Sequence, residues 1–386
     1  MQRVVIVGAG IIGLSTAYAL LKQGVKHVTV LEQETVDHAR GTSHGLSRLL
    51  RFEYGPELFY SQLVQSSVEA WRNLQRQARR TLYTPVGLLV LGHEQDNFTQ
   101  PSYHILRELG LPTRQLTQQE CATHFPQFVT HDYDFCTYNA EAAILHASDC
   151  LHTLKEQILL LGGTIYENSK VTHLFHDHAQ RPIQLQLASG DELLTERVVL
   201  AIGPWLHQLL GPLRLPVRMT RQYLLYFSPL SPDDFNHHVF PAFFAHDLYG
   251  FPLHNNHKNQ GPTWLKVASH AFGVSADPDA HHPVEEQVIA QLQRRIGELL
   301  PALRNAPLAH IESSMYDVTG DEHFILDTLP DDPRIVIGTG FSGHGFKFGP
   351  LIGEILSSLV RDEEPPVSLQ RFQLARFARV RETVGA

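Results

Sequence analysis

The chain opens on residues whose types and spacing suit the binding of a dinucleotide. The segment Gly8-x-Gly10-x-x-Gly13 follows an apolar run at residues 4–7, and Glu32 ends a second such run at residues 28–31. In this pattern Gly8 permits a tight turn, Gly10 lets a pyrophosphate approach the backbone, and Gly13 lets a helix lie close to the sheet. The free N–H groups at the helix N-terminus favour phosphate, and Glu32 can accept hydrogen bonds from a ribose hydroxyl.

Four basic residues could bind an anion or stabilise a developing negative charge. Arg48 and Arg51 are three residues apart in a Gly-rich region, so we expect them to share one face of a helix or a turn. Lys266 interrupts an apolar strand at residues 264–267, and Lys347 interrupts the apolar stretch 345–349. Arginine suits a carboxylate because its planar fork matches two oxygens. Each residue also has a plainer interpretation, as a solvated surface cation or as one whose stem crosses an apolar edge.

Elements of both regular types surround these residues. Apolar residues at helical spacing predict helices at 57–80, 147–161, 284–300 and 350–359. Short β-branched runs predict strands at 4–7, 28–31, 83–91, 164–166, 170–174, 183–187, 198–203 and 334–340, and residues 216–275 are mainly strand-like. Three αβ blocks are therefore separated by β-rich inserts.

The length of 386 residues favours two domains. We expect an α/β fold with a Rossmann-like nucleotide domain of discontinuous segments, residues 1–85, 140–215 and 310–386. A second, sheet-based substrate domain would comprise residues 86–139 and 216–309. With 43% hydrophobic and 18% charged residues, the composition is that of a globular enzyme.

Charge and hydropathy argue against several partners. The net charge of -9 disfavours nucleic acid, and no apolar run approaches the ~20 residues that cross a bilayer. Because the fingerprint begins at residue 4, we expect no signal peptide, and because the C-terminus carries no peroxisomal signal, we expect a cytoplasmic location. We also expect a monomer.

Cysteine and histidine give little sign of a metal centre. The three cysteines form no CxxC pair, so we expect reduced core thiols at Cys121, Cys136 and Cys150. His173, His176 and His178 could form a metal cluster, but an exposed hairpin tip explains them better, and we predict no metal site.

Beyond the glycine fingerprint, two longer segments resemble one family. The segments are Gly41-Thr-Ser-His-Gly-Leu-Ser-Arg-Leu-Leu-Arg-Phe-Glu-Tyr-Gly55 and Gly340-Phe-Ser-Gly-His-Gly-Phe-Lys-Phe348. With residues 249–252, 265–270, 315–316 and 321–324 in the same order, the whole chain resembles the monomeric sarcosine oxidase and N-methyltryptophan oxidase family, which is D-amino-acid-oxidase-like. The resemblance implies FAD, oxidation of a secondary (N-methyl or cyclic) amino acid to an imine, and reduction of oxygen to hydrogen peroxide.

The resemblance also implies a role for each matching residue. The FAD-binding set is Gly8, Gly10, Gly13, Glu32, Ser43, Arg48, Val171, Gly343, His344 and Gly345. The expected catalytic and substrate set is Arg51 and Lys347 for the substrate carboxylate, Lys266 for oxygen activation, and Tyr249, His270 and Tyr316 as pocket walls. Hydride removal needs orientation and electrostatics from the protein, while the flavin takes the electrons.

Two features depart from the resemblance. Covalent members carry a flavin-linking cysteine where this chain has Ser314, so we predict non-covalent FAD. The stretch from Phe240 to Tyr249 is shorter than expected, which leaves the substrate open. The alternatives are a flavin-dependent amine or amino-acid dehydrogenase that uses another acceptor, a fructosyl-amino-acid oxidase, a nicotinamide enzyme, and a flavin-binding protein without turnover.

Overall fold

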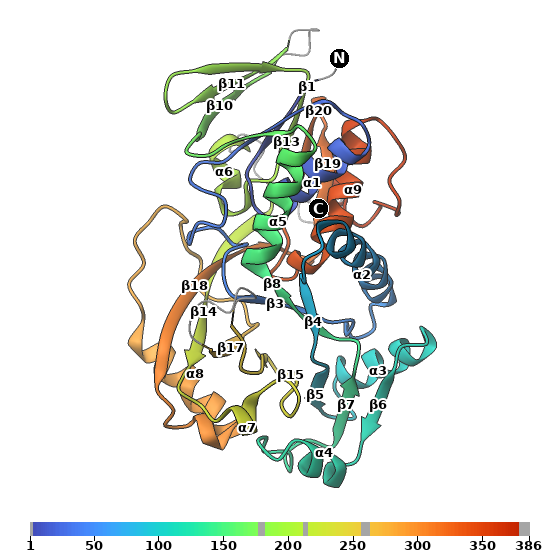
Figure 1. Ribbon diagram of the computed structural model, residues 1–386, viewed down its shortest axis with the longest axis vertical. Helices are drawn as coiled ribbons and strands as arrows, with labels where there is room; N and C mark the ends of the chain where they lie inside the picture. Colours follow the sequence, from blue (N-terminus) through green and yellow to red (C-terminus); the bar gives the residue numbers. More distant parts are fainter. Residues whose placement is uncertain (1–2, 177–181, 211–214, 256–262, 378–386) are drawn as a thin grey trace, which may run out of the picture.

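A six-stranded sheet forms the upper half of the molecule (Figure 1). The computed structural model describes residues 3–176, 182–210, 215–255 and 263–377. The strand order is β19-β20-β13-β1-β2-β9, and all neighbours are parallel except β19 and β20. The strands are β1 (Arg3–Val7), β2 (His27–Leu31), β9 (Thr164–Tyr166), β13 (Arg197–Leu200), β19 (Ile325–Leu329) and β20 (Asp332–Thr339).

Four helices from distant parts of the sequence pack together beside this sheet. Helix α1 (Ile11–Lys22) contacts both α5 (Ala147–Leu160) and α9 (Gly349–Val360), and α2 (Leu58–Ala78) lies against α9. Figure 1 shows these blue, green and red segments side by side. Their apolar side chains share one buried cluster with β1, β2 and β20, so early, middle and late segments form one core.

An eight-stranded sheet occupies the lower half, in the order β18-β14-β17-β16-β15-β5-β7-β6. Strand β14 (Val217–Phe227) pairs antiparallel with β18 (Leu308–Thr319) along almost its whole length. The other strands are β5 (Leu88–Gly92), β6 (Thr113–Leu116), β7 (Phe135–Asn139), β15 (Ala242–Ala245), β16 (Leu248–Gly250) and β17 (Leu265–Ser269). Helix α8 (Glu286–Leu299) adds its apolar face to the core of this sheet.

Two small sheets and several short helices complete the fold. One sheet joins β3 (Ser47–Leu50), β8 (Ala143–His146) and β4 (Tyr83–Pro85), and the other joins β10 (Val171–Phe175), β11 (Ile183–Leu187) and β12 (Glu192–Thr195). The short helices are α3 (Thr99–Glu108), α4 (Gln118–His124), α6 (Leu206–Leu210) and α7 (Pro232–Phe235). Cys121, Cys136 and Cys150 are buried and free.

The predicted fold class is confirmed, and each of the four predicted helices is present within a few residues of its expected bounds. Residues 83–91, where strands were expected, hold two strands, β4 and β5. Gly87 adopts φ +71°, and the N–H groups of Val86 and Gly87 both bond to the Ala142 carbonyl. The chain therefore turns there, and β4 and β5 join different sheets. The division into two domains stays a prediction. In the described part of the chain, no helix has the length and apolar character that a membrane span requires.

Candidate functional site

A cleft runs from the carboxyl ends of β1, β2 and β13 towards the eight-stranded sheet, and its empty space, part of it open to solvent, is about 1810 Å³. Ligands of open α/β sheets bind at this edge of the strands. Fourteen of the sixteen predicted site residues line the cleft: Gly8, Gly10, Glu32, Ser43, Arg48, Arg51, Val171, Tyr249, His270, Tyr316, Gly343, His344, Gly345 and Lys347. Gly13 and Lys266 lie behind its wall.

The turn between β1 and α1 leaves no space for side chains. Gly8 has φ +101°, and a Cβ atom on Gly13 would lie 1.9 Å from the Gly8 carbonyl oxygen. The Ser43 hydroxyl accepts a hydrogen bond of 3.0 Å from the Ile11 N–H, at the start of α1. The helix therefore presents its N-terminus, a polar hydroxyl and a bare backbone to the cleft, which suits a pyrophosphate.

Glu32 stands at the end of β2 with its carboxylate fixed. It accepts hydrogen bonds from the N–H groups of Ala9 at 2.7 Å and Glu34 at 3.1 Å, and its Oε1 lies 3.4 Å from His38 Nε2. Burial opposes ionisation, but the bonds from His38, Ala9 and Glu34 outweigh it and hold the pKa of Glu32 below its usual value. A buried, ionised acceptor in this position fits a ribose hydroxyl.

The expected helix or turn at Arg48 and Arg51 is wrong, because β3 is a strand that ends at Leu50. Arg48 lies within this strand, and its guanidinium donates to the carbonyls of Ser47 at 2.8 Å, Thr42 at 2.7 Å and His44 at 2.6 Å. These bonds tie the loop before β3 to the cleft wall, beside the Phe346 ring at 5.6 Å.

Arg51, just past the end of β3, sits in an aromatic cage with an unused donor. Its side chain is 7% exposed, and its guanidinium carbon lies 4.7 Å from the Tyr54 ring centroid, 5.4 Å from Phe98 and 5.3 Å from Phe244. Its buried Nη1 has no hydrogen-bond partner in the described part of the chain. Because a buried charged donor without an acceptor is costly, this arrangement calls for an anionic ligand.

Lys347 is the second buried cation of this region and comes from the short 3-10 helix Phe346–Phe348. Its ammonium donates to the Tyr54 hydroxyl at 2.8 Å and to the His344 carbonyl at 3.1 Å. Burial and the nearby charge of Arg51 hold the pKa of Lys347 well below its usual value. Tyr54 therefore links both cations, a role that the sequence analysis missed.

Tyr249, His270 and Tyr316 form a neutral wall of the same end of the cleft. The rings of His270 and Tyr249 lie 6.3 Å apart, and those of His270 and Tyr316 lie 6.4 Å apart. Burial, helped by Arg51 and Lys347, lowers the pKa of His270 to about 3, and burial raises the pKa of both tyrosines. All three side chains are thus uncharged near neutral pH.

Lys266, on β17, is 1% exposed and lies one layer behind the cleft. Its ammonium donates to the carbonyl of Ser47 at 2.8 Å and faces the rings of Phe251 at 5.3 Å and Tyr226 at 5.8 Å. Burial and the charge of Arg48 lower the pKa of Lys266 to about 7. Since Ser47 itself lines the cleft, the ammonium approaches the site from behind this residue.

The loop after β20 crosses the cleft in a tightly constrained path. Gly343 has φ +76°, and a Cβ atom there would lie 2.4 Å from the Tyr316 ring. Asp317 Oδ2 accepts from the Gly340 N–H at 2.7 Å and the Thr339 hydroxyl at 3.2 Å, and burial raises the pKa of Asp317 to about 6. The sequence analysis missed Asp317, because nothing in its spacing marks it as the anchor of a distant loop.

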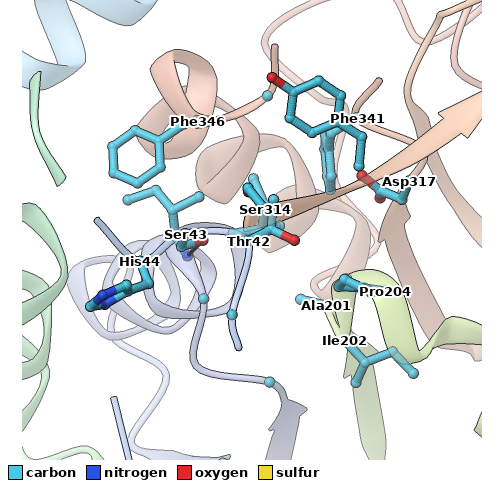
Figure 2. Close-up of a pocket in the computed structure, with 18 of the residues that line it drawn as sticks. Thr42, Ser43, His44, Ala201, Ile202, Pro204, Ser314, Asp317, Phe341 and Phe346 are labelled. Carbon is cyan, nitrogen blue, oxygen red and sulfur yellow. Dashed lines mark hydrogen bonds between the residues drawn. The ribbon is translucent and has the colours of Figure 1, made fainter. Parts of the chain in front are cut away.

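Ala201, Ile202, Pro204 and Trp205 also line the cleft and were missed, and Figure 2 shows the first three along one side. They follow β13 directly. The expected strand at residues 198–203 could have identified them, because ligands gather where parallel strands end.

Ser314, on β18, faces the cleft beside Thr42 and Ser43 (Figure 2). None of the three cysteines lines it.

The candidate metal cluster is only partly described. His173 is exposed on β10, His176 contacts Asp332 at 3.3 Å, and His178 falls outside the described residues. Within the described ranges, no group of three or more His, Cys, Asp or Glu side chains could hold a metal ion.

Comparison with known proteins finds a matching family and several similar proteins. The family described as FAD dependent oxidoreductase matches residues 3–359. Peroxisomal sarcosine oxidase of Mus musculus is 32% identical, over 97% of this chain and 96% of that protein. Monomeric sarcosine oxidase of Bacillus sp. (strain B-0618) is 28% identical, with 97% and 96% covered. N-methyl-L-tryptophan oxidase of Yersinia pestis (strain Pestoides F) is also 28% identical, with 97% and 98% covered.

Solved structures share the fold at lower identity. L-proline dehydrogenase from P. horikoshii superposes with a TM-score of 0.84 at 18% identity, over 98% of both chains. NikD, an unusual amino acid oxidase of nikkomycin biosynthesis, gives 0.81 at 22% identity, over 96% of this chain and 97% of its own.

Proposed function

We propose that this chain, which belongs to the FAD dependent oxidoreductase family, oxidises a small secondary amino acid, N-methyl or cyclic, to an imine and passes the electrons to oxygen to give hydrogen peroxide. The family and its relatives make it an FAD-dependent enzyme that oxidises amines. The substrate class and the acceptor are the proposed part. The caged, unpartnered guanidinium of Arg51 is the observation that carries the substrate class.

The cleft residues fit FAD. Gly8, Gly10 and the N-terminus of α1 would hold the pyrophosphate, and Glu32 would hold the ribose next to the adenine. Ser43, Arg48, Val171 and the loop 343–345 would lie along the rest of the cofactor. When bound, FAD accepts the hydride equivalent that leaves the carbon next to the amine nitrogen.

Arg51 and Lys347 would bind the substrate carboxylate. Both cations are buried, both contact Tyr54, and Arg51 Nη1 has no acceptor among the described residues. A carboxylate would satisfy that donor and pair with a positive charge in a low-dielectric site, where such bonds are strong.

The same cations would favour the reactive form of the amine. A protonated amine beside Arg51 is repelled by the guanidinium charge, and by the Lys347 ammonium where the bound carboxylate keeps it protonated, and this repulsion lowers the pKa of the amine. His270, Tyr249 and Tyr316 are neutral, so they add no negative charge that would oppose this effect. The amine can therefore bind with its nitrogen lone pair free, as hydride loss requires.

Lys266 would assist the reduction of oxygen. A cation close to the site where superoxide forms stabilises it by Coulomb attraction. The ammonium of Lys266 is buried between aromatic rings, where its charge is weakly screened.

Attachment of FAD is proposed to be non-covalent. Ser314 lines the cleft, and its hydroxyl stands where the resemblance implies the flavin-linking cysteine of covalent members, so it would not form that thioether. Acid precipitation should leave a white pellet and a yellow supernatant, whereas a yellow pellet contradicts non-covalent attachment.

An anaerobic substrate screen tests the proposed reaction. We expect sarcosine, N-methyl amino acids, proline or pipecolate to bleach the flavin, while N-methylethanolamine, which has no carboxylate, does so far less readily at equal concentration. Equal bleaching by both groups contradicts carboxylate recognition. No bleaching by any secondary amino acid contradicts the substrate class.

A flavin-dependent dehydrogenase is the second candidate. The bond between Lys266 and the Ser47 carbonyl keeps this ammonium behind the cleft wall, which would weaken its action on oxygen. Peroxide release in air supports the oxidase, and fast reduction of an artificial dye with little peroxide supports the dehydrogenase.

A further inference from the structure

Trp205 closes the end of the cleft next to Glu32 and is held by a residue from a distant loop. Its side chain is 7% exposed and lines the cleft, and its Nε1–H donates to Asp279 Oδ1 at 2.9 Å. Asp279 lies in the loop between β17 and α8, 74 residues further along the chain. The wall at this end is therefore completed from a separate part of the fold.

Asp279 gathers donors from two further elements. Its carboxylate accepts hydrogen bonds from Arg40, in the loop after β2, and from Gln208, on α6. These bonds connect three segments that lie far apart in the sequence, those around residues 40, 205 and 279. Asp279 therefore acts as their common anchor.

Arg40 adds a second contact across the same indole. Its guanidinium carbon lies 5.3 Å from the Trp205 ring centroid, and its Nη1 donates to Glu34 Oε1 at 2.8 Å. The His38 ring, which contacts Glu32, lies 5.9 Å from the indole. Trp205 is thus enclosed by Arg40 and His38, and His38 also contacts Glu32, the proposed ribose acceptor.

The loop presents Asp279 in a fixed orientation. The Ala276 N–H donates to the Met219 carbonyl at 3.1 Å, which anchors the loop to β14, and the Asp279 N–H donates to Asp277 Oδ1 at 2.9 Å. The side chain of Asp279 is 40% exposed, so its ion pair with Arg40 alone would contribute little. Its bond to the buried indole is the contact that reaches the cleft.

We infer that Asp279, Arg40 and Trp205 form a latch, a cluster of positioning residues that closes over the adenosine half of FAD and slows its departure. The inference rests on the proposed non-covalent FAD, because a cofactor without a tether needs its dissociation slowed by contacts alone. Glu32 and the cradle at Gly8 would fix the ribose and the phosphates, and the latch would confine the nucleoside end beside them.

Binding to apoprotein tests the latch. Asp279→Asn removes the charge while it keeps the size of the side chain, and Trp205→Phe removes the N–H while it keeps a ring. Loss of the charge on the acceptor in Asp279→Asn, or of the indole donor in Trp205→Phe, predicts a rise of about tenfold to a hundredfold in the Kd for FAD and for ADP. Titrations that follow flavin fluorescence and tryptophan quenching measure both. FMN, which lacks the adenosine half, should keep its affinity.

Glu69→Gln provides the matched control, because it removes the same charge from an exposed ion pair with Arg76 on α2. We expect it to leave all three affinities unchanged. Equal weakening of FMN and ADP binding by Asp279→Asn, or a lower unfolding temperature of the variant apoprotein with unchanged ADP affinity, would show a merely structural tie and overturn the latch. A yellow acid pellet from the wild type would contradict non-covalent attachment and, with it, the latch. This result therefore distinguishes a failure of the proposed attachment from a failure of the latch alone.

Discussion

Arg51 shows what a single residue can and cannot reveal in a sequence. Its type and its place in a Gly-rich segment indicated a carboxylate partner. Its cage could not be predicted, because Tyr54, Phe98 and Phe244 come from three separate places in the chain. The unpartnered Nη1 is likewise a product of packing, since only burial turns an ordinary surface donor into one that requires an anion.

Lys266→Met should separate the two half-reactions. Loss of the ammonium should slow reoxidation of the reduced enzyme by about a hundredfold, a typical cost for one stabilising group. Reduction by substrate should change far less, because Lys266 lies outside the cleft wall. Stopped-flow spectroscopy measures both rates.

The rate of reoxidation should also depend on pH. The pKa of Lys266 is lowered to about 7, so the ammonium is present below this pH and is lost as pH rises through it. Wild-type reoxidation should therefore slow above about pH 7, and Lys266→Met should not show this step. Lys22→Met, an exposed lysine on α1, should behave as wild type. Reduction and reoxidation that slow equally in Lys266→Met would contradict a role in oxygen activation.

At the scale of elements, the turn from β1 to α1 was fully predictable and β3 was not. The first is local, since strand, glycines and helix are adjacent in the sequence and each glycine has a steric reason. Strand β3 exists because β8, nearly 100 residues later, pairs with it. A pairing of this kind leaves no mark in four residues, which explains why a helix or turn was expected at Arg48.

Substitutions at Gly10 and Gly13 in this turn should therefore have different effects, the first on FAD binding and the second on folding stability. A Cβ on Gly10 meets only the Ser43 side chain, at 3.1 Å, whereas one on Gly13 lies 1.9 Å from the Gly8 backbone oxygen. Gly10→Val should give folded, colourless apoprotein. Gly13→Ala should force α1 away from β1 and lower the unfolding temperature of the apoprotein. Circular dichroism melts with flavin quantification measure both effects. A Gly10→Val protein that keeps its full flavin content would contradict the proposed phosphate cradle.

For the whole molecule, the sequence predicted an αβ sheet interrupted by β-rich inserts, and the strand order shows why. Strand β1 lies next to β13, and β13 lies next to β20. In the sequence, nearly 200 residues separate β1 from β13, and more than 300 separate β1 from β20. The cleft therefore combines residues from 7 to 347, and a change at either end of the chain can affect one ligand. The contacts of Tyr54, Asp317 and Asp279 all cross between such segments, which is why they emerged only from the structure.

The rate of anaerobic flavin reduction as a function of substrate concentration tests the central claim most directly. With an N-methyl amino acid that reduces the wild type, Arg51→Met should need about a hundredfold more substrate for half-saturation, since loss of one partner of a buried charge pair costs about 3 kcal/mol. Arg107→Met, an exposed arginine on α3, should match the wild type. Half-saturation at the same concentration in Arg51→Met and wild type would contradict carboxylate recognition by this cleft.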